Sequence, residues 1–263
     1  NPVAKGPSPM IRRKLFMNIY ADNAATTKMS ENAINTMLFH MKEVYGNPSS
    51  LYGVGQKAKE ALEDARRRAS AVLNCEPREI YFTSGGSEAD NQAIISAASF
   101  NAAKGKKHII STAFEHHAVL HTLDKLKKEG FEIELLDVHS NGIVTAEQVK
   151  NAIREDTALV TIMYANNEIG TIQPISEIGA VCRERGVLFH TDAVQAIGHI
   201  PVDIQKDNID MLSLSAHKFK GPKGVGILYA KKGIPLTNII EGGAQERGKR
   251  AGTENLPGIV SMV

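Results

Sequence analysis

The 263-residue sequence has little of several features that mark specialised protein classes. It contains two cysteines, Cys75 and Cys182, and no tryptophan. So few cysteines argue against a disulfide framework and favour a reducing compartment, and we therefore expect a cytoplasmic protein. No Cys/His spacing indicates a zinc site, and we expect no metal. The formal net charge of +2, without a dense Lys/Arg stripe, argues against direct binding of nucleic acid.

Long hydrophobic runs are also missing. No apolar stretch approaches the length of a membrane span, so we expect no membrane partner. Residues 1–16 carry Lys5, Arg12, Arg13 and Lys14 without a long apolar run, which differs from a secretory signal. We therefore interpret residues 1–16 as a remnant, leader or irregular tail, and residues 17–263 as the folded part.

Apolar runs and helical patterns alternate along the folded part. Short runs rich in β-branched and aliphatic residues predict strands at 79–82, 108–111, 133–138, 159–165, 187–190, 211–215 and 225–229. The segments between them predict helices at 55–73, 87–100, 116–128, 146–154 and 174–185. This alternation predicts an α/β fold with a mostly parallel sheet sandwiched by helices.

Polar residues gather immediately after five of the predicted strands. The clusters are 83–87 (TSGGS), 115–117 (EHH), 166–168 (NNE), 191–195 (TDAVQ) and 215–218 (SAHK). In sheets of this kind, ligands bind beyond the carboxyl ends of the strands. Because the clusters occupy equivalent positions, we expect them to form one concave polar site.

The first cluster is suited to a phosphate group. Gly85 and Gly86 stand between a strand and a helix, and Ser87 with Asp90 matches a capping box. Open N–H groups and the helix dipole favour an anion there. Taken alone, the cluster is better explained as an ordinary capped turn. The sequence offers no G-x-G-x-x-G motif and no Walker lysine, so nucleotide binding fits poorly.

The later clusters contain a carboxylate, a lysine and a histidine with possible chemical roles. Asp192, at a buried strand end, would suit a protonated pyridine nitrogen, although structural aspartates are common at such positions. Lys218 in a partly desolvated pocket would be a nucleophile toward an aldehyde, and Ser215 and His217 could donate to a phosphate. Without this context, such a lysine is more often a surface charge. His116 could stack on a ring and move protons, or simply begin a helix.

Several longer segments then resemble a known family. They are 20–27 (YADNAATT), 46–50 (GNPSS), 82–91 (FTSGGSEADN), 166–170 (NNEIG), 190–195 (HTDAVQ), 215–226 (SAHKFKGPKGVG) and 242–255 (GGAQERGKRAGTEN). In this order they resemble the NifS/IscS-type cysteine desulfurases, which are class V aminotransferase-like enzymes of fold type I that use pyridoxal 5′-phosphate (PLP). The resemblance extends from about Met17 to the last residue, and it implies a PLP-binding large domain with its N-terminal segment.

The resemblance implies a role for each matching residue. Lys218 would bind the cofactor covalently and move protons at the substrate Cα, Asp192 would contact the pyridine nitrogen, and His116 would stack on the ring. Asn167 and Gln195 would reach the phenolic oxygen. The phosphate would be held by Gly86, Ser87, Ser215 and His217, with Thr253 reaching the phosphate of a neighbouring subunit. That last role implies a homodimer.

The resemblance also implies an activity that this chain carries only in part. Family members convert L-cysteine to L-alanine and pass the sulfur to an enzyme cysteine as a persulfide, for iron–sulfur cluster assembly on a scaffold protein or for tRNA thiolation. The nucleophilic cysteine and a substrate-binding arginine lie in a small C-terminal domain that would follow Val263. Neither Cys75 nor Cys182 matches that nucleophile. We therefore expect a fragment of a longer protein, with little turnover by itself, or a naturally short PLP-binding protein.

Other functions remain open from the sequence. A selenocysteine lyase or an aminotransferase of the same class would carry similar cofactor residues. A non-catalytic truncated module could compete for the dimer partner or a scaffold protein. A nicotinamide dehydrogenase is a more distant alternative, because the glycine fingerprint is missing.

Overall fold

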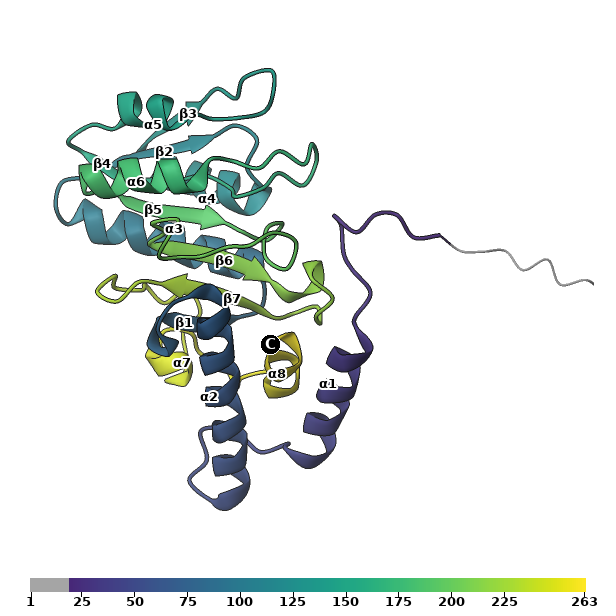
Figure 1. The fold of residues 1–263 in the computed structure, drawn as a ribbon. Helices are drawn as coiled ribbons and strands as arrows, with labels where there is room; N and C mark the ends of the chain where they lie inside the picture. Colours follow the sequence, from purple (N-terminus) through teal and green to yellow (C-terminus); the bar gives the residue numbers. More distant parts are fainter. Residues whose placement is uncertain (1–18) are drawn as a thin grey trace, which may run out of the picture.

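The computed structural model describes residues 19–263, so the expected tail at 1–16 lies outside the described residues. Seven strands form one sheet in the order β1-β7-β6-β5-β4-β2-β3 (Figure 1). Neighbouring strands from β3 to β6 are parallel, whereas β7 is antiparallel to both β6 and β1. The strands are β1 (Ile80–Thr83), β2 (His108–Thr112), β3 (Glu132–Leu136), β4 (Thr157–Thr161), β5 (Leu188–Asp192), β6 (Met211–Ser215) and β7 (Gly226–Ala230). The mostly parallel α/β sheet predicted from the sequence is confirmed.

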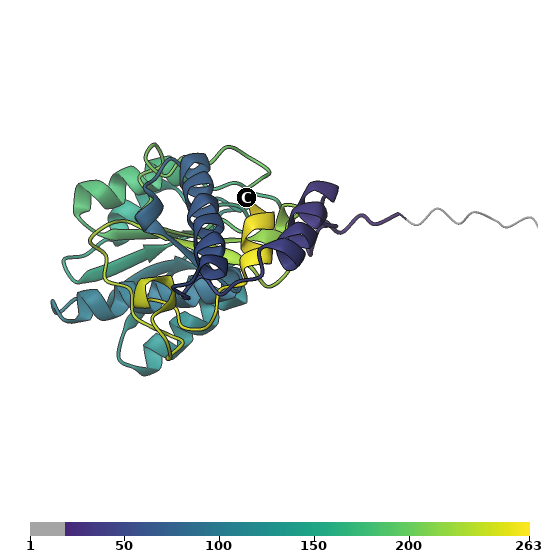
Figure 2. The ribbon, with the colours of Figure 1, turned by 90° about the horizontal axis from the view of Figure 1, so that it is seen from below.

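Helices cover both faces of the sheet (Figures 1 and 2). The helices are α1 (Glu31–Glu43), α2 (Gly53–Leu73), α3 (Gly86–Ala102), α4 (His117–Lys128), α5 (Ala146–Ala152), α6 (Ile175–Arg185), α7 (Gln245–Gly248) and α8 (Leu256–Met262). One core cluster joins α2, α6 and α8 to one face of the sheet, and a second joins α3 and α4 to the other. Successive strand residues alternate between them: Ile109 packs in the second cluster and Ile110 in the first.

Helix α2 shows how the sequence produces this packing. Its buried residues include Ala58, Leu62, Ala65, Ala69 and Leu73, whose spacings of three and four place them on one helix face. The helix ends at Asn74, whose φ of 55° is left-handed and is tolerated by asparagine. The small alanines allow the helix to lie close to the sheet, and this packing orients β1 and the loop that follows it.

The predicted elements agree with the structure within a few residues at most ends. The predicted strand 159–165 is observed as Thr157–Thr161. Beyond its end, the N–H groups of Ile162 and Tyr164 still donate to the carbonyl groups of His190 and Asp192 in β5. Helix α1 was not predicted, although Ile34, Met37, Leu38 and Met41 have helical spacing. It begins after Ser30, whose Oγ accepts from the Ala33 N–H at 3.1 Å. Helix α8 follows the segment 242–255 directly, and the Asn255 side chain accepts from the Gly258 N–H at its start.

A buried ion pair joins α2 to α7. Arg66 and Glu246 are 2% and 4% exposed, and Arg66 Nη2 lies 2.7 Å from Glu246 Oε1. Arg66 Nη1 donates to Glu246 Oε2 at 2.9 Å, and the same oxygen accepts from the Phe82 N–H at 2.9 Å. These bonds offset the cost of burying both charges and fix α7 beside β1.

Between residues 19 and 263, no helix has both the length and the apolar character needed to cross a membrane.

Candidate active site

The polar clusters predicted after the strands meet in one cleft of about 910 Å³ at the carboxyl ends of the parallel strands. Every expected site residue except Thr253 lines it: Gly86, Ser87, His116, Asn167, Asp192, Gln195, Ser215, His217 and Lys218. The polar clusters after β1, β2, β4, β5 and β6 therefore converge as expected. Their roles toward a cofactor remain proposals.

The loop between β1 and α3 forms a cradle suited to an anion, but the predicted cap is wrong. Gly85, with φ of 152°, is the N-cap of α3, and no side chain caps the helix. Ser87 lies inside the first turn, and Asp90 is buried rather than bonded to it. The helix begins one residue earlier, at Gly86, which packs tightly: a Cβ there would lie 2.6 Å from Val194 Cγ2. The free N–H groups of the first turn therefore open into the cleft.

Lys218 lies in a short 3-10 helix (Ala216–Lys218) that directly follows β6. Its Nζ donates to the carbonyl oxygens of Ala24 at 2.5 Å and Ala25 at 3.0 Å. Burial lowers the pKa of Lys218, while the charges of Asp192 and Asp22 act in the opposite direction. A lowered pKa increases the fraction of neutral amine, which is the form that attacks an aldehyde.

Asp192 ends β5 and is 5% exposed. Its Oδ1 accepts from the Val194 N–H at 2.9 Å. Burial raises the pKa of Asp192, and the Val194 amide and the charges of His116 and Lys218 oppose this rise. A carboxylate in this position is ready to receive a cationic N–H group from a ligand in the cleft.

His116 is the N-cap of α4. Its Nδ1 accepts from the Ala118 N–H at 3.1 Å, which requires the neutral ring to carry its proton on Nε2. A ring nitrogen of His116 lies within 4.8 Å of carboxyl oxygens of Asp192 and Asp90. The histidine thus begins a helix, as one sequence interpretation held, and also lines the cleft.

Asn167 and Gln195 lie at the mouth of the cleft. Asn167 Nδ2 donates to Glu168 Oε1 at 2.8 Å, and Gln195 Nε2 donates to the Ala24 carbonyl at 2.8 Å. The neighbouring Asn166 has a structural role, since its Oδ1 accepts from the Glu168 and Ile169 N–H groups. Only the second asparagine of the pair is therefore offered to a ligand.

The N-terminal segment 22–27 is a part of the site that sequence reasoning gave no role. Asp22, Ala24, Ala25 and Thr26 line the cleft. Thr27 Oγ1 donates to the His217 carbonyl at 2.8 Å and accepts from the Lys220 N–H at 2.7 Å. The motif YADNAATT contains these residues, but the contacts of Ala24 and Ala25 are made by backbone carbonyl groups, which leave no signal in side-chain chemistry. Lys223 also lines the cleft.

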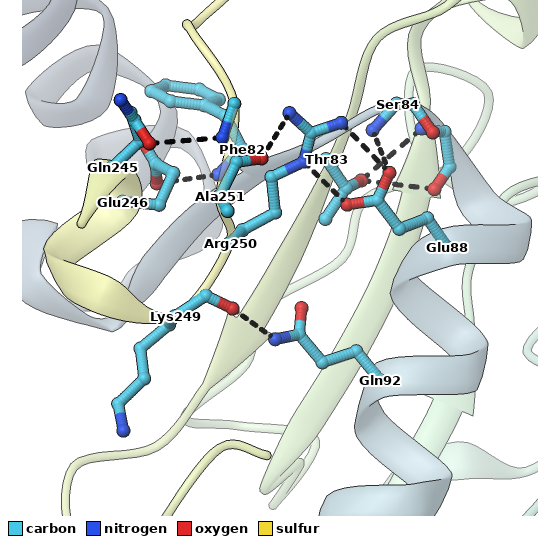
Figure 3. A network of polar contacts seen from close by, with 12 residues as sticks. Phe82, Thr83, Ser84, Glu88, Gln92, Gln245, Glu246, Lys249, Arg250 and Ala251 are labelled. Carbon is cyan, nitrogen blue, oxygen red and sulfur yellow. Dashed lines mark hydrogen bonds and ion pairs between the residues drawn. The ribbon is translucent and has the colours of Figure 1, made fainter. Parts of the chain in front are cut away.

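Thr253 lies in a neighbouring small pocket and is exposed. Its segment is held against the anion cradle through Arg250, as Figure 3 shows. Arg250 Nε donates to Glu88 Oε1 at 2.9 Å, and Glu88 Oε2 accepts from the Ser84 N–H at 2.9 Å. Gln92 Nε2 donates to the Lys249 carbonyl at 2.7 Å. The structure therefore separates Thr253 from the other expected residues while tying its segment to the loop that begins α3.

Neither cysteine lies in the described part of the cleft lining. Cys182 is fully buried in the core cluster that joins α2, α6 and α8 to the sheet, and burial raises its pKa. Cys75 is half-buried, and burial raises its pKa to about 12. Both thiols are thus held in the unreactive protonated form.

Comparison with known proteins agrees with this geometry. The family model described as "Aminotransferase class-V" matches residues 19–263. A relative named cysteine desulfurase IscS from Methanosarcina thermophila is 54% identical over 244 residues, which cover 93% of this chain and 60% of the relative. The chain thus spans about 60% of the length of this curated relative.

Solved structures give the same result. A structure titled "NIFS-LIKE PROTEIN" superposes with a TM-score of 0.90 at 44% identity, covering 94% of this chain and 68% of that one. One titled "SspA in complex with cysteine" has a TM-score of 0.89 at 41% identity, covering 92% of this chain and 70% of that one. The family match over all described residues, with the strand-end cleft that the motifs form, shows that the chain belongs to the class-V aminotransferase family.

Proposed function

We propose that this chain is the cofactor-binding part of a PLP-dependent cysteine desulfurase, a transferase that converts L-cysteine to L-alanine and transfers the sulfur. The observation that carries the proposal is that Lys218, Asp192 and the Gly85–Gly86 loop line a single cleft. The relatives named cysteine desulfurase, and the similar structure solved with cysteine, support this choice of substrate.

The residues of the cleft fit PLP. A phosphate suits the cradle where α3 begins, because Gly85, Gly86 and Ser87 line the cleft and no described side chain accepts from the first-turn N–H groups. Ser215 and His217 line the same cleft and can donate to phosphate oxygens. An amine of lowered pKa suits the aldehyde, and a buried carboxylate suits the pyridine nitrogen.

When bound, PLP would supply an electron sink for the carbanion formed at the substrate Cα. The remaining chemistry belongs to the chain's own residues. Lys218 would hold and move the proton of that carbon through Nζ. Asp192 would keep the pyridine nitrogen protonated, and Asn167 and Gln195 would orient the ring through its phenolic oxygen. His116, whose Nδ1 is occupied by the Ala118 amide, would stack on the ring.

The sulfur acceptor and the assembly also belong to this proposal. Because Cys75 and Cys182 are both removed from the cleft, we expect sulfur transfer to require another thiol. Thr253, exposed on the tethered segment 249–255, would reach the phosphate of a second copy in a homodimer. We propose a cytoplasmic enzyme that passes sulfur to an iron–sulfur scaffold or another acceptor protein.

The test is a cofactor and product assay. The purified chain, incubated with PLP and then freed of unbound PLP by gel filtration, should keep a visible absorbance that changes when L-cysteine is added, and Lys218→Ala should abolish this bound absorbance. Alanine and sulfide release, measured with an added thiol, should be slow or missing in the chain as it stands. Release of alanine and selenide from selenocysteine, with no reaction of cysteine, would favour a selenocysteine lyase. Product formation only when a keto acid is added would favour an aminotransferase. A folded protein with no absorbance change would contradict the proposal.

A further inference from the structure

A second carboxyl group lies beside Asp192 at the floor of the cleft. Asp90 comes from the second turn of α3 and is 1% exposed. One of its oxygens lies within 4.8 Å of an oxygen of Asp192 and a ring nitrogen of His116. Its Oδ1 has no hydrogen-bond partner among residues 19–263. Two buried carboxyl groups at this distance cannot both be ionised without a large electrostatic cost.

The groups that face Asp90 do not compensate a negative charge. His190 Nε2 lies 3.7 Å from Asp90 Oδ1, but burial lowers the pKa of His190 to about 3. Its ring nitrogens already contact Thr161 Oγ1 at 2.8 Å and Ser213 Oγ at 3.0 Å. Glu115 is another buried acid, whose pKa burial raises to about 8. Among residues 19–263, Asp90 thus faces a neutral histidine, two other acids and the Ser213 hydroxyl, with His116 at the cleft side.

The two carboxyl groups differ in the neighbours that stabilise their ionised forms. Asp192 accepts from the Val194 N–H, and Lys218 and His116 favour its ionised form. Burial raises the pKa of Asp90 well above its ordinary value, and the nearby charge of Asp192 raises it further, while the Ser213 hydroxyl opposes this rise. If one proton is shared between the two groups, it belongs on Asp90.

We propose that Asp90 is a positioning residue that carries a proton at neutral pH and presents it to Asp192, which stays ionised toward the cofactor. This inference rests on the proposed function, since Asp192 acts on PLP only if PLP binds here. A neutral donor behind a carboxylate stabilises its charge and limits its rotation. Asp90, which also lines the cleft, would thus set how firmly Asp192 holds the pyridine proton.

The protonation state can be measured without PLP. Carbon-13 NMR of the chain labelled only at aspartate side-chain carboxyl groups excludes Glu115 from the spectrum. We expect one resonance, assigned by its loss in Asp90→Asn, to have the shift of a protonated acid at pH 7. An Asp90 resonance that titrates in the acid range of exposed aspartates would overturn the inference.

Variants separate the proton from the shape of the side chain. Asp90→Asn keeps an uncharged donor, whereas Asp90→Leu removes it at similar size. We expect PLP affinity to stay within about twofold in Asp90→Asn and to fall about tenfold in Asp90→Leu, as for a lost hydrogen bond to a charged group. Ser111→Ala is the matched control, because Ser111 Oγ is also buried and without a partner in the described chain; its affinity should not change.

The outcomes distinguish this inference from the proposed function. Equal weakening in both Asp90 variants would show that a negative charge is needed there, and unchanged affinity in both would remove the positioning role. Should Asp90→Leu fail to fold, the NMR titration and Asp90→Asn still decide the protonation. Absence of PLP binding in the wild type would overturn the proposed function and Asp90's role toward PLP, whereas an ordinary aspartate titration would overturn the inference alone.

Discussion

Lys218 Nζ lies 2.5 Å from the carbonyl oxygen of Ala24, although 194 positions separate the two residues in the sequence. The contact brings the N-terminal segment over the lysine and contributes to its partial burial. Gln195 donates to the same carbonyl at 2.8 Å. The turn at 23–25 thus organises one side of the cleft through its backbone carbonyl groups.

Thr27→Val should loosen this segment. The substitution keeps the side-chain shape but removes the hydroxyl that bonds the Lys220 N–H and the His217 carbonyl. Because Thr27 is 8% exposed, we expect a loss of about 1–3 kcal/mol in the free energy of unfolding. Urea denaturation measures it, with Thr27→Ser as the control that keeps the hydroxyl. Equal stability of the two variants would show that these bonds do not matter.

Glu88→Gln should weaken the connection between Arg250 and the anion cradle. Burial raises the pKa of Glu88, but its bonds from Arg250 and Ser84 lower it more, and the net pKa is lowered. The ionised carboxylate therefore stabilises the fold at every pH above the ordinary pKa of 4.5. This contribution is lost as pH falls through the lowered pKa of the folded state.

The stability difference between wild type and Glu88→Gln should accordingly be about 1–2 kcal/mol at pH 7 and shrink toward zero in acid. Unfolding measured across the acid range checks this. Asp64→Asn is the control, because its ion pair with Arg67 is exposed on both sides and should contribute almost nothing. A difference that persists unchanged in acid would point to packing rather than charge.

Glu115→Gln should make the protein more tolerant of alkaline pH. Burial raises the pKa of Glu115 from 4.5 to about 8, so the folded protein holds a proton that the unfolded chain releases. The stability from this proton is full below pH 4.5 and is lost as pH rises toward 8. The amide of the variant stays neutral, so its melting temperature should fall less between pH 5 and about 8 than that of the wild type. Melting temperatures that depend on pH in the same way in wild type and variant would contradict the raised pKa of Glu115. Glu184→Gln serves as the control, because Glu184 is exposed.

The two cysteines should be dispensable for cofactor binding. Burial holds the pKa of Cys75 near 12 and raises that of Cys182, so iodoacetamide should label neither readily at neutral pH. Cys182 should react only on unfolding, and Cys75→Ser should leave PLP binding unchanged. Rapid labelling of native Cys75, or loss of PLP binding in Cys75→Ser, would give that thiol a role the structure does not support.

The sequence predicted the strands and the convergence of the polar clusters because both depend on local patterns. Strand–helix alternation fixes a parallel sheet, and parallel strands bring their carboxyl ends to one edge. The clusters around Asp192 and Lys218 therefore had to meet, whatever the details of the loops between them.

Other features depend on contacts that no local pattern encodes. The bonds of Lys218 to Ala24 and Ala25 use main-chain oxygens, which every residue possesses. The buried Arg66–Glu246 ion pair joins residues 180 positions apart. Ser87 and Asp90 matched a capping box, yet the helix begins at Gly86, and Asp90 is buried and lines the cleft.

The most direct test of the account is borohydride reduction of the purified chain with PLP, followed by peptide mapping. In the wild type, Lys218 should carry a phosphopyridoxyl group. In Lys218→Arg, no other lysine should carry this group, including Lys223, which also lines the cleft. Modification of Lys223 instead, or no modification of Lys218 in a protein shown to be folded, would contradict the assignment of this cleft as a PLP site.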